Sequence, residues 1–506
     1  MFDIQKIFQW IKSNFGKKDF LFISIIIIFY FLTRLINLEQ LPVFNDEGIY
    51  IHWAKVAWHD ASWRFVSLTD GKQPLQTWGT IPFLKLFPDN ALFAGRLFSV
   101  ATGFFGLTGL FSLLFYLFNK KTAFIGSFLY ILTPYFLFYD RLAMVDSGVN
   151  AFFIWILFFS VLLINTMRLD VALLFGLIAG MGLLAKSSVR LFVGLSILAP
   201  ILLKDLFQKT KRNLIKLPSF FILFGITGTI ALVIYNVQRL SPFLHFVEEK
   251  NNTFVMSFSE WINNPFAVLF HNLRTIPYYV FSELGWIILP FGILGLGKLF
   301  SKNKKLFLYL ISWLLIPYIG ISMMTRVLFP RYIIFFGTLI LIFASFYLGT
   351  LKKQMFLIAS FFMIIVGTLF FNYSILFDYS KIPFPPTDRG QYIESVTVGY
   401  GIKEIIAFAR EKSKEKPVII LAEGDFGMTG DVLDVFLRKD DKIFIKGYWP
   451  LDEKELLQHQ IDLQKNYVYA VVSHSLDYPK NWPVRLVKSY YKPNNKSVIY
   501  LLELTQ

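Results

Sequence analysis

The chain contains a succession of long apolar runs separated by polar connections. A membrane-spanning helix needs about 20 apolar residues, and eleven runs approach that length. They lie near residues 20–38, 93–118, 122–139, 147–166, 171–185, 190–203, 217–236, 278–300, 306–324, 332–350 and 355–376. Only 17% of the 506 residues are charged, whereas a soluble domain carries roughly 25%. The pattern predicts a polytopic α-helical membrane protein with about eleven transmembrane helices.

Basic residues gather in alternate connections of this predicted bundle. The N-terminal segment contains Lys6, Lys12, Lys17 and Lys18. Every second connection after it is also basic, at residues 119–121, 168, 204–216, 301–305 and 352–353. Lys and Arg accumulate in cytoplasmic loops, so we place these segments in the cytoplasm and the other connections outside. The net charge of +16 then reflects topology and contact with membrane lipids, and we expect no nucleic-acid partner.

The C-terminal 130 residues have a different pattern from the rest. Residues 1–376 are predicted to form the transmembrane domain, and residues 377–506 an extracytoplasmic α/β domain. Helices are expected at 392–413, 428–438 and 452–464, and strands at 418–421, 442–446, 468–472, 485–491 and 498–502. The sequence of this domain contains no phosphate-binding loop, so we assign it no catalytic role. A prokaryotic plasma membrane is the expected location, with the endoplasmic reticulum as the alternative.

The first outer connection contains two acidic residues at the start of an amphipathic segment, 48–58. Asp46 or Glu47 is placed to act as a general base toward an attacking hydroxyl, although Asn45 or Asp46 could instead cap the helix expected at 48–58. Lys72 follows in the same connection, before a second amphipathic segment at 74–87. Its ammonium group is a candidate to bind a lipid phosphate, or it snorkels to the interface.

The second outer connection is short and carries Asp140, Arg141 and Asp146. Its charges must therefore stay at the membrane surface, close to the first connection. An ion pair between Asp140 and Arg141, or a helix cap at Asp146, are the structural alternatives.

Four further cations complete the candidate site. Lys186 and Arg190 lie between two short apolar arms, 171–185 and 191–203, each spanning roughly 20–22 Å against about 30 Å of hydrocarbon. Their tip should dip below the outer interface, where a cation is costly and usually functional. Arg326 and Arg331, followed by Tyr332, run against the positive-inside bias. Phosphate binding would explain them, because guanidinium matches phosphate geometry, while solvated loop charge is the alternative.

The long connection 237–277 contains His245, Glu248, Glu249 and His271 without the spacing of a zinc site. It is long enough to act as a lid. We expect neither a metal nor another cofactor, and the chain has no cysteine to bind one.

Five motifs together resemble the GT-C glycosyltransferases, in the branch of the protein O-mannosyltransferases and lipid A aminoarabinose transferases. They are Asn45–Tyr50, Lys72–Trp78 with Gln73 in place of a proline, Asp140–Asp146 followed by Phe152 and Phe153, Gly182–Ser187, and Pro330–Tyr332. Their order along the chain is that of the family, and all five are on the predicted outer side.

The resemblance implies a polyprenyl-phosphate-linked monosaccharide donor and direct displacement with inversion at the anomeric carbon. It implies that Asp46 is the base, with Glu47 as the alternative, and that Asp146 supports the site or orients the acceptor. Lys72, Lys186 and Arg331, with Arg326 as the alternative to Arg331, would bind the donor phosphate. Arg141, Arg190, Arg326 and Tyr332 complete the expected substrate-binding set. The acceptor would be a glycan, lipid or protein hydroxyl outside the cytoplasm.

Other functions are compatible with parts of the pattern. A transporter or lipid flippase is the main alternative, but transport sites usually lie at the bilayer midplane between repeats, and no repeat is evident. An oligosaccharyltransferase would share the fold, but the Trp-Trp-Asp motif of that family is absent from the sequence. A non-catalytic receptor whose tail binds a ligand is the third.

Overall fold

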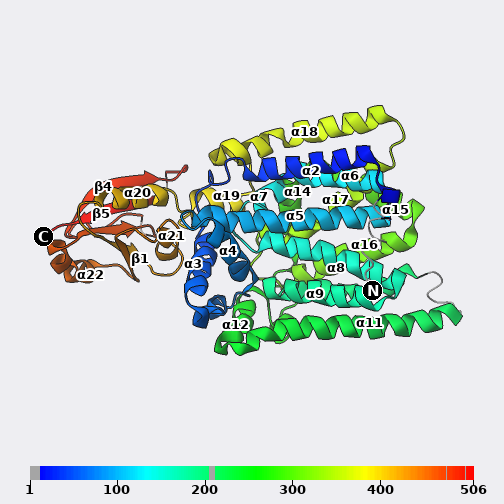
Figure 1. Cartoon of the computed structure of the whole chain (residues 1–506), viewed down its shortest axis with the longest axis horizontal. Coiled ribbons are helices and arrows are strands. Elements are labelled where there is room, and N and C mark those ends of the chain that lie inside the picture. Colours follow the sequence, from blue (N-terminus) through cyan, green and yellow to red (C-terminus); the bar gives the residue numbers. More distant parts are fainter. Residues whose placement is uncertain (1–8, 10–11, 204–210, 475, 496) are drawn as a thin grey trace.

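The computed structural model describes residues 9, 12–203, 211–474, 476–495 and 497–506. The predicted basic residue Lys6 and residues 204–210 of the basic connection 204–216 lie outside these ranges. A helical bundle forms most of the molecule, and a small α/β domain sits at one end of it (Figure 1). Helices α3 (Asn45–His59) and α4 (Leu75–Leu86) lie between the two parts. We call this end of the bundle the α3 end.

The protein is a multi-pass membrane protein. Six described helices are long and apolar enough to cross a membrane, and the pair α14–α15, bent by 112°, would make a seventh. The helices of the bundle are α2 (Lys17–Leu35), α5 (Ala91–Leu117), α6 (Lys120–Leu132), α7 (Pro134–Tyr139), α8 (Asp146–Thr166), α9 (Leu169–Ala185), α10 (Val189–Leu195), α11 (Lys211–Tyr235), α14 (Leu269–Leu284), α15 (Ile288–Lys302), α16 (Lys304–Met324), α17 (Ile334–Gly349) and α18 (Gln354–Phe377).

The predicted number of eleven continuous spans is not confirmed, because several predicted spans are broken. The span expected at 122–139 divides at Pro134 into α6 and α7, since proline cannot continue the hydrogen-bond ladder of a helix. The span expected at 278–300 bends after α14, where Gly285 adopts a left-handed conformation with φ of 82°. The span expected at 190–203 continues from α10 as a 3-10 helix, Ser196–Leu202, that contains Pro200.

The apolar helices differ in how much of their surface is covered. The most apolar segments of α8 and of Pro330–Gly349, which includes α17, are 83% and 78% buried, whereas the corresponding shares of α11 and α18 are 17% and 22%. A helix that is apolar all round belongs in a core or in lipid. The first two therefore form the centre of the bundle, and the last two present their side chains to the lipid.

The predicted basic connections meet at the end of the bundle opposite α3. Lys120 pairs with Asp19 at 2.7 Å, and Lys121 donates to the carbonyl of Leu351 at 2.7 Å. Lys305 donates to the carbonyl of Leu203 at 2.7 Å. These contacts group the connections in the way that the charge pattern predicted.

The C-terminal domain contains one five-stranded sheet with the order β2-β1-β3-β5-β4. The strands are β1 (Val418–Glu423), β2 (Ile443–Tyr448), β3 (Tyr467–Val472), β4 (Val484–Tyr491) and β5 (Val498–Leu504), and all five were predicted. β1 runs parallel to both β2 and β3, while β5 is antiparallel to β3 and β4. Separate apolar clusters cover the two faces of the sheet.

The helices of this domain are shorter than the sequence predicted. They are α19 (Pro386–Arg389), α20 (Ile402–Lys412), α21 (Gly430–Asp434) and α22 (Glu453–Gln458). The helix expected at 392–413 starts ten residues later, because Gly401 has a left-handed conformation with φ of 86° directly before α20.

Candidate active site

Asp46 lies in the first turn of α3, between two cations that come from distant parts of the chain. One carboxylate oxygen is 3.4 Å from Lys72 Nζ, and the other accepts a hydrogen bond of 3.1 Å from Arg331. The Asp46 side chain is 21% exposed. Burial alone would raise the pKa of its carboxyl group, but the positive charges of Lys72 and Arg331 lower that pKa to about 2. Asp46 is therefore a carboxylate at neutral pH.

Lys72 is positioned by a tight turn. It follows a 3-10 helix, Val66–Asp70, that ends at Gly71 in the left-handed conformation. Its ammonium group lies 3.4 Å from Asp70 as well as from Asp46. It also lies over the rings of Tyr50 and Trp53, at 5.1 and 5.5 Å from their centroids. This lysine is thus surrounded by anionic and aromatic groups, and it is 18% exposed.

Arg331 enters the site from the 3-10 helix Pro330–Ile333, which precedes α17. Its guanidinium donates to Asp46 and, at 3.3 Å, to the hydroxyl of Tyr392. Three rings lie 5.1 to 5.3 Å from the guanidinium carbon, those of Phe44, Phe329 and Tyr332. These contacts hold the planar group in one orientation. Tyr392 belongs to the segment that follows the last span, so the C-terminal part of the chain contributes to the site.

Lys186 and Asp146 form the second ion pair of the site. Lys186, directly after α9, approaches Asp146 in the first turn of α8 at 2.9 Å. Its ammonium group lies 4.0 Å from the centroid of Tyr332, whose ring also contacts Arg331. The neighbouring Ser187 hydroxyl accepts hydrogen bonds from Gln73 at 2.5 Å and from Asn251 at 3.2 Å. The tip of the α9–α10 hairpin is therefore hydrogen-bonded to the first outer connection, through Gln73, and to the connection 237–277, through Asn251.

Helix α12 (His245–Phe254) closes one side of this cluster. Its Lys250 pairs with Asp70 at 2.8 Å, and its Asn251 reaches the α9–α10 hairpin. The predicted lid segment thus does contact the first connection. Among the described residues, the cluster combines four cations, Lys72, Lys186, Lys250 and Arg331, with the three carboxylates Asp46, Asp70 and Asp146. The excess of cations suits an anionic ligand.

Glu47 occupies a quite different environment from Asp46. Its side chain is fully buried and accepts four hydrogen bonds: Arg96 Nε and the Ala143 N–H on one oxygen, at 2.9 and 2.7 Å, and Arg96 and the Phe44 N–H on the other, at 2.8 and 3.0 Å. The bond to Phe44 caps α3. Glu47 is thus the capping residue, whereas the sequence had suggested Asn45 or Asp46, and none of its surface is left for a substrate.

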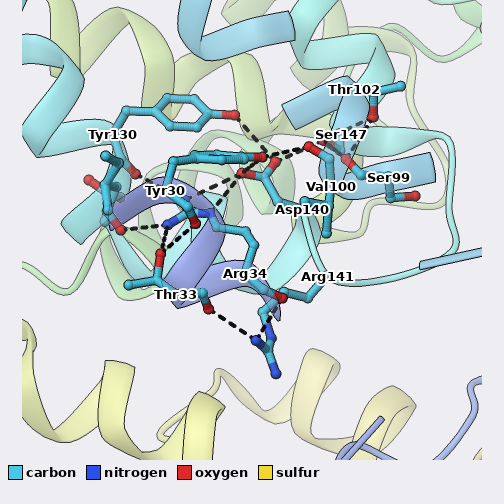
Figure 2. A network of polar contacts seen from close by, with 12 residues as sticks. Tyr30, Thr33, Arg34, Ser99, Val100, Thr102, Tyr130, Asp140, Arg141 and Ser147 are labelled. Carbon is cyan, nitrogen blue, oxygen red and sulfur yellow. Dashed lines mark hydrogen bonds and ion pairs between the residues drawn. The ribbon is translucent and has the colours of Figure 1, made fainter. Parts of the chain in front are cut away.

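The expected ion pair between Asp140 and Arg141 does not form. Asp140 instead pairs with Arg34 of α2 at 3.3 Å, and it accepts hydrogen bonds from Ser147 at 2.8 Å and from the hydroxyls of Tyr30 and Tyr130. Arg141 points away from Asp140 (Figure 2) and donates to backbone carbonyls at the end of α2, those of Thr33, Arg34, Ile36 and Asn37. Both side chains hold the second connection against α2.

Two other predicted cations have partners elsewhere. Arg190 donates to the hydroxyl of Tyr235 in α11 and lies over its ring. Arg326 pairs with Glu260 in α13 (Phe258–Asn263), and both side chains are exposed. Asp146 does not cap α8, since its carboxylate binds Lys186. Within the described ranges, no group of three or more histidine, aspartate or glutamate side chains is arranged to hold a metal ion.

The structure also shows polar residues that sequence reasoning passed over. Arg96 is fully buried and pairs with Glu47. Its place inside a predicted span was a signal, because an intramembrane arginine requires a partner. Asp388 in α19 is fully buried, accepts a hydrogen bond from Tyr139, and burial raises the pKa of its carboxyl group to about 7. Neither Asp388 nor Tyr392 has a sequence signal, because each depends on where the C-terminal segment folds back.

Comparisons with known proteins agree with this architecture. The structure resembles the crystal structure of ArnT from Cupriavidus metallidurans bound to undecaprenyl phosphate, with a TM-score of 0.60 and 15% identity over 95% of this chain and 97% of that chain. The chain has the GT-C fold. It also resembles the oligosaccharyltransferase AglB from Archaeoglobus fulgidus, in complex with an inhibitory peptide and a dolichol-phosphate, with a TM-score of 0.52 and 12% identity over 91% of this chain and 70% of that chain.

Sequence comparison points to the same superfamily. Residues 72–236 match the family described as dolichyl-phosphate-mannose-protein mannosyltransferase. No curated protein sequence matches the chain. The resemblance to the GT-C glycosyltransferases that the motifs indicated is thereby confirmed. The matched segment contains Lys72, Asp146 and Lys186, while Asp46 and Arg331 lie outside it.

Proposed function

We propose that this protein is an integral membrane glycosyltransferase. It transfers a monosaccharide from a polyprenyl-phosphate donor to the hydroxyl group of a glycan, lipid or protein acceptor. The observation that carries the proposal is Asp46, held as a carboxylate between Lys72 and Arg331 and beside the Lys186–Asp146 pair. A potential base thus lies next to three cations. The structural neighbours bound to undecaprenyl phosphate and dolichol-phosphate support a donor of this class.

The three cations receive the donor phosphate. Arg331 offers a fork that pairs with two phosphate oxygens, and Lys72 and Lys186 add two flexible point charges. When the bond between the anomeric carbon and the phosphate oxygen breaks, negative charge grows on the phosphate. Cations that are already in place stabilise that charge in the transition state more than in the ground state.

Asp46 accepts the proton of the acceptor hydroxyl. The acceptor oxygen forms its bond to the anomeric carbon on the face opposite the departing phosphate, so the configuration inverts. A carboxyl group with a pKa of about 2 is a weak base. Binding of the donor phosphate raises that pKa, because the phosphate offsets the positive charge of Lys72 and Arg331. Asp46 therefore becomes a stronger base when the donor is present.

An apolar cavity of about 320 Å³ is placed to take the start of the prenyl chain. Helices α14, α15, α16 and α17 form it, and its lining includes Tyr318 and Phe336. Arg331 lies in the 3-10 helix that leads directly into α17. A phosphate at Arg331 can thus extend its chain toward this cavity.

The site lies on the extracytoplasmic side of the plasma membrane in this proposal. The basic connections gather at the opposite end of the bundle from α3 (Figure 1), and basic connections mark the cytoplasmic side. The C-terminal domain, which sits at the α3 end, then faces the same compartment as the acceptor.

A transfer assay on Asp46→Asn tests the proposal. Purified protein in lipid is given radiolabelled polyprenyl-phosphate sugars, with native membrane and cell-envelope extract as the acceptor. We expect transfer by the wild type and a loss of about 10²- to 10⁴-fold in Asp46→Asn. Asp60→Asn, in the same connection but exposed, is the matched control and should retain activity. Folded wild type that neither transfers nor hydrolyses any donor would contradict the proposal and favour a transporter.

A further inference from the structure

The C-terminal sheet has an edge at which three parallel strands end together. β1, β2 and β3 are adjacent and run in one direction, so Glu423, Tyr448 and Val472 close the strands at the same edge. Apolar clusters cover both faces of this sheet. In open α/β sheets, ligands bind in the crevice outside the carboxyl ends of the strands. This edge is therefore a candidate position for a ligand.

A buried carboxylate fixes the shape of the edge. Glu423 is 7% exposed, and one of its oxygens accepts hydrogen bonds of 2.7 Å from the N–H groups of both Ser473 and His474. This joins the end of β1 to the end of β3. The His474 ring, 30% exposed, lies edge-on to Trp449 with centroids 5.1 Å apart. The loops after the strands are thus held together by specific contacts.

Two large aromatic side chains are exposed at this edge. Trp449 follows β2 and is 68% exposed, and Phe426 follows β1 and is 52% exposed. Asp425, next to Phe426, is also exposed. Aromatic side chains usually bury most of their surface. Two of them beside acidic groups and a histidine have the composition of a ligand site, in which aromatic surface is combined with a few polar groups.

The edge faces the candidate active site. The ring of Phe426 lies 6.2 Å from that of Trp53, and the Trp53 ring lies 5.5 Å from the ammonium group of Lys72. The backbone of Gly427 approaches Asn45 so closely that a Cβ at that position would lie 2.5 Å from the amide oxygen. Helix α21 packs against α3, between the sheet and the bundle (Figure 1). The loop after β1 therefore reaches the first turn of the helix that carries Asp46.

We propose that this edge is an acceptor subsite that binds a saccharide ring. The inference rests on the proposed function and specifies its acceptor as a glycan or glycoconjugate. A pyranose ring has an apolar face of C–H groups, which packs on exposed aromatic rings such as Trp449 and Phe426. Its hydroxyl groups are donors that suit the carboxylate of Asp425. Acidic side chains repel phosphate and anionic headgroups, so a neutral sugar fits this edge better than a charged lipid does.

Saccharide binding can be measured without turnover. The full chain in lipid nanodiscs is titrated with soluble neutral oligosaccharides (chitotetraose, mannotriose and maltotriose), followed by saturation-transfer NMR of the sugar. We expect millimolar binding of at least one of them, weakened about tenfold or more in Trp449→Ala and in Phe426→Ala. Phe444→Ala is the matched control, because Phe444 is 57% exposed near the opposite end of β2. It should bind the sugar as the wild type does.

Three results obtained without turnover would overturn the subsite. One is the absence of binding by every oligosaccharide at millimolar concentration. Another is equal affinity of wild type and Trp449→Ala. The third is quenching of Trp449 by brominated lipid, measured as the difference between wild type and Trp449→Ala, since it would show that the indole is a membrane anchor.

The same variants separate this inference from the proposed function. If the enzyme is active, Trp449→Ala should raise the acceptor KM while donor hydrolysis stays unchanged. If sugar binding depends on Trp449 but the protein transfers no sugar from any donor, the saccharide subsite is supported and the glycosyltransferase activity is refuted. Transfer with an unchanged acceptor KM in Trp449→Ala would support the glycosyltransferase and refute the saccharide subsite.

Discussion

Asp46 and Glu47 are neighbours in the sequence, yet their carboxylates lie in different regions of the molecule. Glu47 is fully buried, and its four hydrogen bonds satisfy both oxygens. Asp46 is one-fifth exposed, and its partners are one flexible lysine and one arginine. A carboxylate that is already saturated can only support the fold, because a ligand would have to break its bonds. A carboxylate that is partly exposed to solvent can exchange its partners for a ligand.

The second connection repeats this contrast. Asp140 is paired with Arg34 in the interior, where both side chains are 1% exposed or less, whereas Asp146 pairs with Lys186, which is 27% exposed. Buried pairs are costly to break, since removal of one partner leaves an uncompensated charge. The inner region therefore holds the connections in place, and the outer region presents cations that an anion can reach. The comparison predicts opposite effects of mutation in the two regions.

The largest effect is expected from breaking the inner pair of Arg96 and Glu47. Arg96→Met leaves the Glu47 carboxylate buried without its cation and should destabilise the protein by about 3–5 kcal/mol. The thermal midpoint of the detergent-solubilised protein measures this loss. The double variant Glu47→Gln with Arg96→Met should recover much of it, because no unpaired charge remains. Asp46→Asn, in the outer region, should leave the midpoint close to that of the wild type. An unchanged midpoint in Arg96→Met would contradict the contrast.

A loss of activity without a loss of stability is expected at Arg331. Arg331→Lys keeps the charge but removes the fork that contacts Asp46 and Tyr392, and we expect kcat to fall about 10²-fold. Arg326→Lys is the matched control from the same connection, since Arg326 pairs with the exposed Glu260. It should stay within about twofold of the wild type, because an exposed ion pair contributes little. Equal losses in both variants would show that the contacts of Arg331 with Asp46 and Tyr392 are not specifically needed for transfer.

A smaller effect is expected in the pH dependence of transfer. The pKa of Asp46 is about 2 in the free protein, so Asp46 should give no acid limb in kcat/KM above about pH 4. The bound donor phosphate raises that pKa, so the acid limb of kcat should lie at higher pH than that of kcat/KM. Lys72→Gln removes the cation that lowers the Asp46 pKa most, and it should move the acid limb of kcat/KM upward. Profiles from pH 4 to 9 would test this, and coincident acid limbs would contradict it.

Much of the outer region could be predicted from the sequence, and little of the inner region. Asp46, Lys72 and Lys186 stand out because they are polar residues between apolar runs. Their roles in catalysis stay predictions. The separation of Asp46 from Glu47 depends on the rotation of α3 about its axis, which no local pattern of a short helix determines. The partners of Asp140 and Arg141 depend on how α2 packs, and Tyr392 reaches Arg331 only through the return of the chain after its last span.

The sheet was predictable because each strand carries its own run of β-branched and aromatic residues. The helices before and between the strands were less predictable, because the residues at which they begin and end depend on Gly401 and on the contact between α21 and α3. The sequence carries no signal for the carboxyl edge of the sheet, because Phe426, Trp449 and His474 lie far apart in the chain and are brought to one edge only by the strand order.

The smallest effect is expected where the C-terminal domain docks on α3. His52 lies 3.0 Å from Asp434 and 3.6 Å from Asp431, and Lys55 also pairs with Asp434 at 3.0 Å. Burial alone would lower the pKa of His52, but its hydrogen bond to Asp434 raises that pKa above its usual value. Burial raises the pKa of Asp431 to about 6. Both groups bind their protons more tightly in the docked state, so both favour docking at low pH.

Docking should therefore weaken as the pH rises through the raised pKa values of Asp431 and His52. Asp434, whose pKa is lowered by its hydrogen bond to His52 against the effect of burial, acts in the opposite sense only below its usual pKa, near pH 4. Hydrogen exchange of α21 and of the first turns of α3 should be slower at pH 6 than at pH 8, after correction for intrinsic rates. His52→Gln should remove most of this difference, and His59→Gln, at the exposed end of α3, should not. If the difference persists in His52→Gln, the contact between the two parts of the molecule depends on apolar packing such as that of Val432 against Gly48, and the charges at this interface add only specificity of position.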